Sequence, residues 1–114
     1  MGQVKVKEIN LERGHPTVDA AIRRLINELQ TAKGAGYKAL IVVHGYGSSG
    51  VGGAIKPAVH SKLRAGSLIG IVRDFVSGED WMNRKSVFVD VCPQLRDFSN
   101  YIAGNRGLTV VLLK

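Results

Sequence analysis

Hydrophobic and polar positions alternate at the start of the chain and then change to a helical period. The alternation predicts a strand over about residues 4–12, ended by Gly14, with apolar positions Val4, Val6, Ile9 and Leu11. After Pro16, apolar residues recur every three or four positions, which predicts a helix through Val18, Ala21, Ile22, Leu25, Ile26 and Leu29. Thr17 is suited to cap the start of this helix, and Gly34 and Gly36 are expected to end it.

A short, unbroken apolar run follows this helix. Residues 38–43 (KALIVV) are rich in β-branched side chains, which is typical of a strand buried on both faces of a sheet. A second helix is predicted after a glycine-rich segment, with Pro57 in its first turn and Gly66 at its end; its apolar positions are Ile55, Ala58, Val59 and Leu63. Residues 67–75 (SLIGIVRDF) predict a third strand.

The last third of the chain carries a weaker pattern until its final strand. Residues 76–86 are typical of a loop, residues 86–92 (SVFVDVC) fit either a strand or a buried helix, and residues 93–104 are typical of a loop with some helix. Residues 108–113 (LTVVLL) predict the last strand. Alternating strands and helices favour right-handed crossovers and a parallel core sheet covered by helices, so the predicted fold class is α/β.

Length and composition indicate one globular domain, residues 1–114. Hydrophobic residues make up 45% of the chain and charged residues 22%, so we expect one ordered core and no disordered tract. No apolar run approaches the roughly 18 residues of a membrane helix, and the first residues lack a secretory signal. Cys92 is the only cysteine, which excludes an intramolecular disulfide and a thiolate metal cage. We therefore expect a soluble, cytoplasmic protein.

The charge balance points to a class of partner. Sixteen Lys and Arg residues against nine Asp and Glu residues give a net charge of +7. Such a charge attracts polyanions, so nucleic acid is the leading partner class, and a basic surface that serves solubility is the alternative. Aromatic residues are few, with Tyr46 alone in the glycine-rich segment, which favours recognition of the nucleic-acid backbone over base stacking.

Three candidate catalytic residues follow the predicted parallel strands. Glu12, His44 and Asp74 stand at the carboxyl ends of the first, second and third strands. The carboxyl ends of parallel strands form the ligand-binding edge of α/β sheets, so we expect the three side chains on one rim. His44 stands out because it lies between the buried strand and the glycine-rich segment.

The segment between that strand and the second helix favours an anion site. Glycines let backbone amides approach a ligand closely, and the following helix directs its free N–H groups to the same point. A phosphate is the expected ligand, and a glycine-rich connection without a ligand is the alternative. The residues expected to hold the phosphate are Gly45, Tyr46, Gly47, Ser48, Ser49, Gly50, Gly52 and Gly53.

Known phosphate motifs fit this segment only in part. Three glycines match GxGxxG, with Asp74 at a suitable distance, but the chain is too short for both halves of a dinucleotide fold. The Walker A spacing fails, because Gly53 and Ala54 replace its lysine and its hydroxyl. A mononucleotide site is therefore a third alternative, and no GxSxG nucleophile elbow occurs.

A long central segment carries a more specific motif. ALIVVHGYGSSGVGGAIKPAVHSKLRAG, with its buried strand, HGxG, glycine-rich turn and helix, resembles the core of the small MutS-related (Smr) domain family. TVDAAIRRLINEL and the closing GLTVVLL resemble the first helix and the last strand of that family. The resemblance covers residues 8–73 and 104–113, with a divergent connection over about residues 76–106. His44, Gly45 and Gly47 carry most of its specificity.

The resemblance implies both a fold and an activity. The fold is a two-layer sandwich in which a strand–helix–strand–helix–strand core and a final strand form a four-stranded mixed sheet with two main helices. The activity is on nucleic acid, by nicking DNA, by cleaving RNA or by binding alone. The family's first strand often ends in LDLHG, whereas this chain has INLERG, with Glu12 where a His is expected. Cleavage is therefore an open question, and a non-catalytic nucleic-acid-binding or ribosome-associated module is the alternative.

Phosphodiester cleavage needs groups that move protons and positive charge that offsets the developing negative charge. His44 is able to transfer a proton near neutral pH. Glu12 or Asp74 is expected to orient His44 or to bind a divalent ion such as Mg²⁺, although no carboxylates are paired at a spacing that indicates a metal site. Whether a divalent cofactor takes part is left open by the sequence.

The second predicted helix carries a basic stripe. Lys56, His60 and Arg64 recur every four residues and so share one face, along which a nucleic-acid backbone is expected to lie. An ordinary solvated helix face is the alternative. Trp81, in a polar segment, is either a contact residue or a lid over the core.

Overall fold

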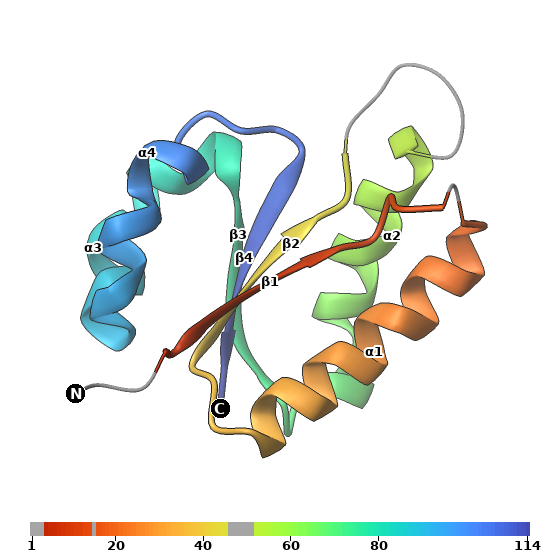
Figure 1. The fold of residues 1–114 in the computed structure, drawn as a ribbon, viewed down its shortest axis with the longest axis horizontal. Helices are drawn as coiled ribbons and strands as arrows, with labels where there is room; N and C mark the ends of the chain where they lie inside the picture. The colour runs from red at the N-terminus through yellow and green to blue at the C-terminus, as the bar shows by residue number, and fades with distance from the viewer. Residues whose placement is uncertain (1–3, 15, 46–51) are drawn as a thin grey trace.

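A computed structural model describes residues 4–14, 16–45 and 52–114 and contains one central sheet (Figure 1). The strands lie in the order β1-β2-β4-β3. β1 and β2 are parallel, and β4 is antiparallel to both of its neighbours, so β3 runs in the same direction as β1 and β2. This four-stranded mixed sheet confirms the predicted α/β fold class. Its strands are β1 (Val6–Asn10), β2 (Ala39–Val43), β3 (Val72–Ser77) and β4 (Leu108–Leu113).

The last strand in the chain lies inside the sheet. All six residues of β4 are buried, and β4 separates β2 from β3. In the register, Leu108 lies opposite Val43, and Thr109 lies opposite both Val42 and Ser77. The start of β4 therefore meets the carboxyl ends of β2 and β3 at one edge of the sheet.

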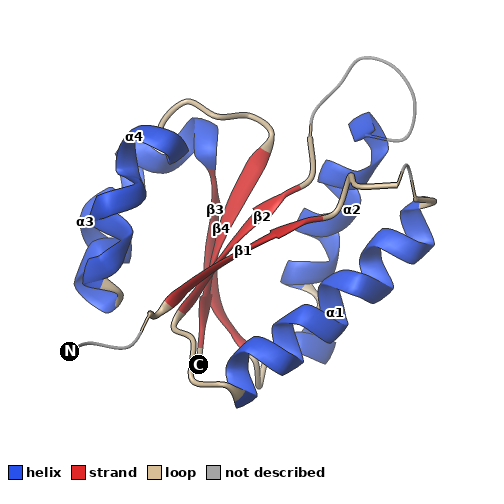
Figure 2. Ribbon diagram, in the orientation of Figure 1, coloured by secondary structure: helices blue, strands red, loops and turns tan. Residues whose placement is uncertain are grey.

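One face of the sheet is covered by α1 (Val18–Gly34) and α2 (Gly52–Arg64) (Figure 2). Their apolar stripes meet aliphatic side chains of the sheet in a first hydrophobic core. Thr17 is confirmed as the N-cap of α1, since its hydroxyl accepts a hydrogen bond of 3.1 Å from the Ala20 N–H. The predicted place of Pro57 is wrong, because α2 begins at Gly52 and Pro57 lies in its second turn.

The opposite face carries a second pair of helices, α3 (Trp81–Val91) and α4 (Ser99–Ile102), joined by a 3₁₀ helix over Pro93–Phe98 (Figure 2). Trp81 and Phe88 are fully buried in a second hydrophobic core, and the Trp81 indole donates a 3.0 Å hydrogen bond to Ser99. The expected loop over residues 76–86 is therefore wrong at Val76 and Ser77, which end β3, and again from Trp81 onward. Trp81 is a core residue, and the two expected helices are joined by a further helical layer.

The third strand begins and ends later than its apolar pattern predicts. Residues 66–68 form a 3₁₀ turn that buries Leu68 and leaves Ile69 exposed, and the strand starts only at Val72. The expected strand over residues 67–71 is therefore wrong. Among the described residues, no helix has the length and apolarity required to cross a membrane.

Candidate functional site

The carboxyl edge of the sheet brings Glu12 and His44 together, as predicted. The Leu11 N–H donates to the Val43 carbonyl (2.8 Å), which places the end of β1 beside the end of β2. The N–H groups of His44 and Gly45 both donate to the Gly107 carbonyl, at 2.9 and 3.0 Å. Gly45 has a φ of +72°, and a Cβ there would lie 1.6 Å from Glu12 Oε1. The positive φ favours glycine at this turn, and a larger residue would also require the exposed Glu12 side chain to move.

His44 is fully buried, and both of its ring nitrogens have partners. Nδ1 lies 2.7 Å from the Gly45 carbonyl oxygen, and Nε2 lies 2.8 Å from Thr109 Oγ1. Because a carbonyl only accepts, Nδ1 carries the proton and Nε2 accepts from the Thr109 hydroxyl. Burial lowers the pKa of His44 to about 4, against the raising effect of the Gly45 carbonyl. At neutral pH, His44 is thus an uncharged link between the glycine turn and β4.

A second histidine extends this link toward the surface. His60 Nε2 lies 2.8 Å from the same Thr109 oxygen. The one hydroxyl proton of Thr109 is directed to His44, so His60 donates its Nε2–H to Thr109. Burial, followed by the charges of Lys56 and Arg64, lowers the pKa of His60. His60 is only partly buried, so the chain from Gly45 through His44 and Thr109 ends at a neutral, accessible imidazole.

The predicted basic stripe is present and lies in the seam between α2 and β3. Lys56 forms an ion pair with Glu79, which follows β3. The guanidinium of Arg64 lies 5.6 Å from the centre of the Phe75 ring, and the His60 ring lies 5.5 Å from the same centre. The stripe therefore contacts the sheet along one side.

The Lys56–Glu79 ion pair is partly exposed, mainly on its Glu79 side. The Glu79 side chain is 41% exposed, and its hydrogen bond with Lys56 lowers the pKa of the carboxyl group. An ion pair exposed to this degree contributes little to stability, about 0 to 1 kcal/mol. The Lys56 side chain is 18% exposed, so its ammonium group is held against Glu79 beside the start of α2.

Asp74 does not join Glu12 and His44 on the carboxyl edge. It lies opposite Leu112, which in turn faces Ala39 at the start of β2. Its carboxylate pairs with Arg84 of α3. The expectation of one rim for all three residues is wrong for Asp74, because β3 continues to Ser77.

Several predicted phosphate-binding residues fall where the structure gives no description. Tyr46, Gly47, Ser48, Ser49 and Gly50 lie outside the described residues, whereas Gly52 and Gly53 form the first turn of α2. Within the described ranges, no group of three His, Cys, Asp or Glu residues is placed to hold a metal ion.

Sequence reasoning missed two residues of the site. Thr109 is the only polar residue within the apolar run LTVVLL, and that position was a usable signal. Glu79 carried no signal, because its partner Lys56 is 23 positions away and the segment around it had no predicted structure.

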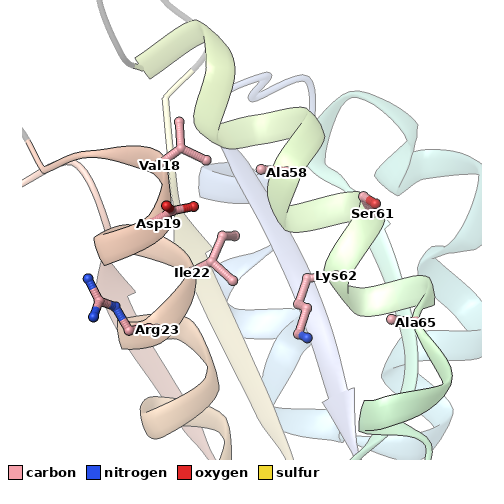
Figure 3. A pocket seen from close by; sticks show the side chains of 8 residues that line it. All are labelled: Val18, Asp19, Ile22, Arg23, Ala58, Ser61, Lys62 and Ala65. Atoms are coloured by element: carbon pink, nitrogen blue, oxygen red, sulfur yellow. The ribbon is translucent and has the colours of Figure 1, made fainter.

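A pocket of about 620 Å³ between α1 and α2 is separate from this site (Figure 3). Val18 and Ile22 of α1 line it together with Ala58 of α2, and charged side chains of Asp19, Arg23 and Lys62 surround them. None of the hydrogen-bonded residues described above lines this pocket. It therefore supplies surface positions whose substitution leaves the carboxyl edge untouched.

Comparisons of the whole chain with known proteins find one protein family and one solved structure that are similar to it. A family model described as the Smr domain matches residues 13–114. Among solved structures, the crystal structure of the Smr domain of Thermus thermophilus MutS2 matches with 25% sequence identity and a TM-score of 0.60, covering 95% of this chain and 98% of that chain. A search of curated proteins finds no match.

Proposed function

This chain belongs to the Smr domain family, and from that premise we propose that it binds nucleic acid through the phosphate backbone. The binding surface is the carboxyl edge of the sheet together with the seam between α2 and β3. The first turn of α2 offers backbone N–H groups to a phosphate, and the stripe of Lys56, His60 and Arg64 continues from that point.

The observation that carries the proposal is the shared direction of these groups. Residues four apart on a helix lie on one side, and the contacts of Lys56 with Glu79 and of Arg64 with Phe75 fix that side toward β3. A nucleic-acid strand that lies along the seam meets four groups in succession: the N-terminus of α2, the Lys56 ammonium, the His60 imidazole and the Arg64 guanidinium. An anion is favoured by the helix N-terminus, by Lys56 and by Arg64, whereas the neutral His60 imidazole adds no positive charge.

Cleavage of a phosphodiester is a second candidate function, supported by the hydrogen-bonded chain. His60 ends that chain as a neutral imidazole, the form that accepts a proton from an attacking hydroxyl or water. The hydrogen bonds through Thr109 and His44 hold the orientation of the His60 ring. In this proposal, His60 is the proton acceptor, and His44 has the positioning role. Glu12, beside Gly45, is available to interact with the nucleophile or a divalent ion.

A binding module without catalysis, including one associated with the ribosome, is the competing function. Two observations favour it: Glu12 replaces the expected histidine, and both ring nitrogens of His44 are already occupied. A nicking assay on supercoiled DNA and on structured RNA, with and without Mg²⁺, separates the two. Binding without strand breaks on either substrate supports the module.

The backbone-binding proposal is tested by the dependence of affinity on salt. With about three to five phosphate contacts, log affinity for duplex DNA falls against log salt with a slope of roughly −3 to −4.5. Changing Lys56→Ala and Arg64→Ala together makes the slope shallower by about 1.8. Arg23→Ala with Lys62→Ala, in the pocket of Figure 3, removes the same charge and is the matched control. If the slope changed equally in both double variants, the seam between α2 and β3 would not be a specific binding surface.

A further inference from the structure

A second pocket, of about 440 Å³, lies where α2, β3 and the start of α3 meet. His60 and Arg64 line it from α2, Phe75 and Ser77 from β3, and Asn83 from α3. Two of these residues, His60 and Arg64, belong to the basic stripe. The pocket therefore opens directly beside the path proposed for the phosphate backbone.

The charges around this pocket balance. Arg64 and Arg84 contribute two positive charges, and Asp74 and Asp80 contribute two negative charges. Arg84 is paired with Asp74, and the Ser77 hydroxyl donates a 3.3 Å hydrogen bond to Asp80. A bare phosphate gains little in such surroundings, because the acidic groups offset the attraction of the basic ones. The pocket favours an uncharged group.

The lining also offers contacts of a particular kind. Phe75 presents a partly buried aromatic ring that lies beside the Arg64 guanidinium and the His60 ring, and these three flat groups together offer a stacking surface. Asn83 is an exposed amide that both donates and accepts hydrogen bonds. An aromatic ring combined with paired donors and acceptors suits a flat heterocycle, whose faces stack and whose edge forms hydrogen bonds. The volume is ample for one such ring.

We propose that this pocket binds one unpaired nucleobase of a strand whose phosphates lie along Lys56, His60 and Arg64. The proposal rests on the backbone-binding function proposed above and adds the substrate class, which is single-stranded or locally unpaired nucleic acid. A base in an intact duplex is stacked and paired, so it reaches the pocket only after unpairing. This departs from the expectation, drawn from the scarcity of aromatic residues, that the backbone alone is recognised.

The test compares four fluorescent ligands of equal length by anisotropy: single-stranded DNA, single-stranded RNA, a blunt DNA duplex and an abasic DNA strand. The abasic strand keeps the phosphates and lacks the bases. We expect both single strands to bind roughly 5- to 100-fold more tightly than the abasic strand, since stacking and edge contacts of one base are lost. The ratio of the affinities for single-stranded DNA and single-stranded RNA then shows which of the two nucleic acids the protein prefers.

Two variants locate the base within the pocket. Phe75→Leu keeps an apolar side chain against the core and removes the ring, so it lowers single-strand affinity by roughly 5- to 100-fold and leaves abasic affinity unchanged. Asn83→Ala lowers single-strand affinity by roughly 2- to 10-fold. Asn100→Ala, at another exposed amide, on α4, is the matched control and leaves all four affinities unchanged.

The outcomes separate this proposal from the one it rests on. No binding of any ligand at low salt contradicts backbone binding itself. Equal binding of the single strands and the abasic strand leaves backbone binding intact and overturns the base pocket. Loss of affinity for all four ligands in Phe75→Leu, with an unchanged melting temperature, also overturns it.

Discussion

The two histidines that share Thr109 occupy very different surroundings. His44 is sealed beneath the glycine turn, with a carbonyl on one ring nitrogen and a hydroxyl on the other. His60 donates to the same hydroxyl but lines an open pocket beside Arg64. The residue that stands out most in the sequence is thus built into the fold, and the accessible imidazole lies one helix away. Stability and ligand chemistry are divided between the two ends of one hydrogen-bonded chain.

Removing the buried end has the largest expected effect. His44→Ala leaves a cavity and deprives the Thr109 hydroxyl and the Gly45 carbonyl of their partner, so the free energy of unfolding falls by about 2 to 4 kcal/mol. Urea denaturation followed by circular dichroism measures this change. If His44→Ala kept its stability but lost cleavage of nucleic acid, His44 would have the catalytic role and His60 would not.

Acid acts on the same end of the chain. The pKa of His44 is about 4 in the folded protein and 6.5 when unfolded, so the unfolded chain binds more protons between these values. The stability that His44 contributes is complete above pH 6.5 and is lost as pH falls toward 4, a decrease of about 2 to 3 kcal/mol. Thermal melts from pH 7.5 to 4 measure the decrease. A Phe replacement, His44→Phe, serves as the reference and loses less over the same range.

Breaking the chain at its centre has a smaller effect. Thr109→Val keeps the shape of a buried strand residue and removes the hydroxyl, leaving two ring nitrogens without their partner, at a cost of about 1 to 3 kcal/mol. Thr109→Ser restores the hydroxyl and is expected to recover most of the loss. Equal stabilities for the Val and Ser variants would mean that the hydroxyl bridge contributes nothing.

The accessible end has the smallest effect on stability. His60→Ala changes the free energy of unfolding by less than about 1 kcal/mol, because the ring is only partly buried, but it weakens oligonucleotide binding about 3- to 10-fold. If the protein cleaves nucleic acid, the cleavage rate of His60→Ala is lower by roughly 10²- to 10⁴-fold. Calorimetry and the anisotropy assay run on one preparation give both numbers. If His60→Ala were as destabilised as His44→Ala, both histidines would contribute to stability and the contrast between them would be wrong.

Parts of the fold were readable from local periodicity, and other parts were not. The apolar positions of α1 recur at helical spacing and four of its residues are buried, so the sequence predicts both the helix and its buried face. In α3 only Trp81, Phe88 and Val89 are buried, which makes no regular stripe. That helix is held by the burial of Trp81 and Phe88 in the second hydrophobic core and by the Trp81–Ser99 hydrogen bond, and a local pattern does not encode these long-range contacts.

The candidate site divides in the same way. The proximity of Glu12 and His44 follows from the parallel pairing of β1 and β2, which the strand–helix–strand pattern predicts. The link from His44 to His60 depends on Thr109, 65 and 49 positions away, and on the insertion of β4 between β2 and β3. No spacing within a motif carries that information. The misplacement of Asp74 has a simpler origin: the apolar residues 67–71 predict strand, which puts Asp74 near the strand end, whereas β3 runs from Val72 to Ser77.

The position of β4 also sets an order on the assembly of the protein during synthesis. β4 follows every other element in the chain, yet it pairs with both β2 and β3 and contributes buried side chains to both hydrophobic cores. Until residues 108–113 are made, β2 and β3 each lack the strand that lies between them in the folded sheet. Strand edges that lack a partner are sites of wrong pairing between chains. Closure of the sheet is thus a late, non-local event that awaits the release of residues 108–113 from the ribosomal tunnel.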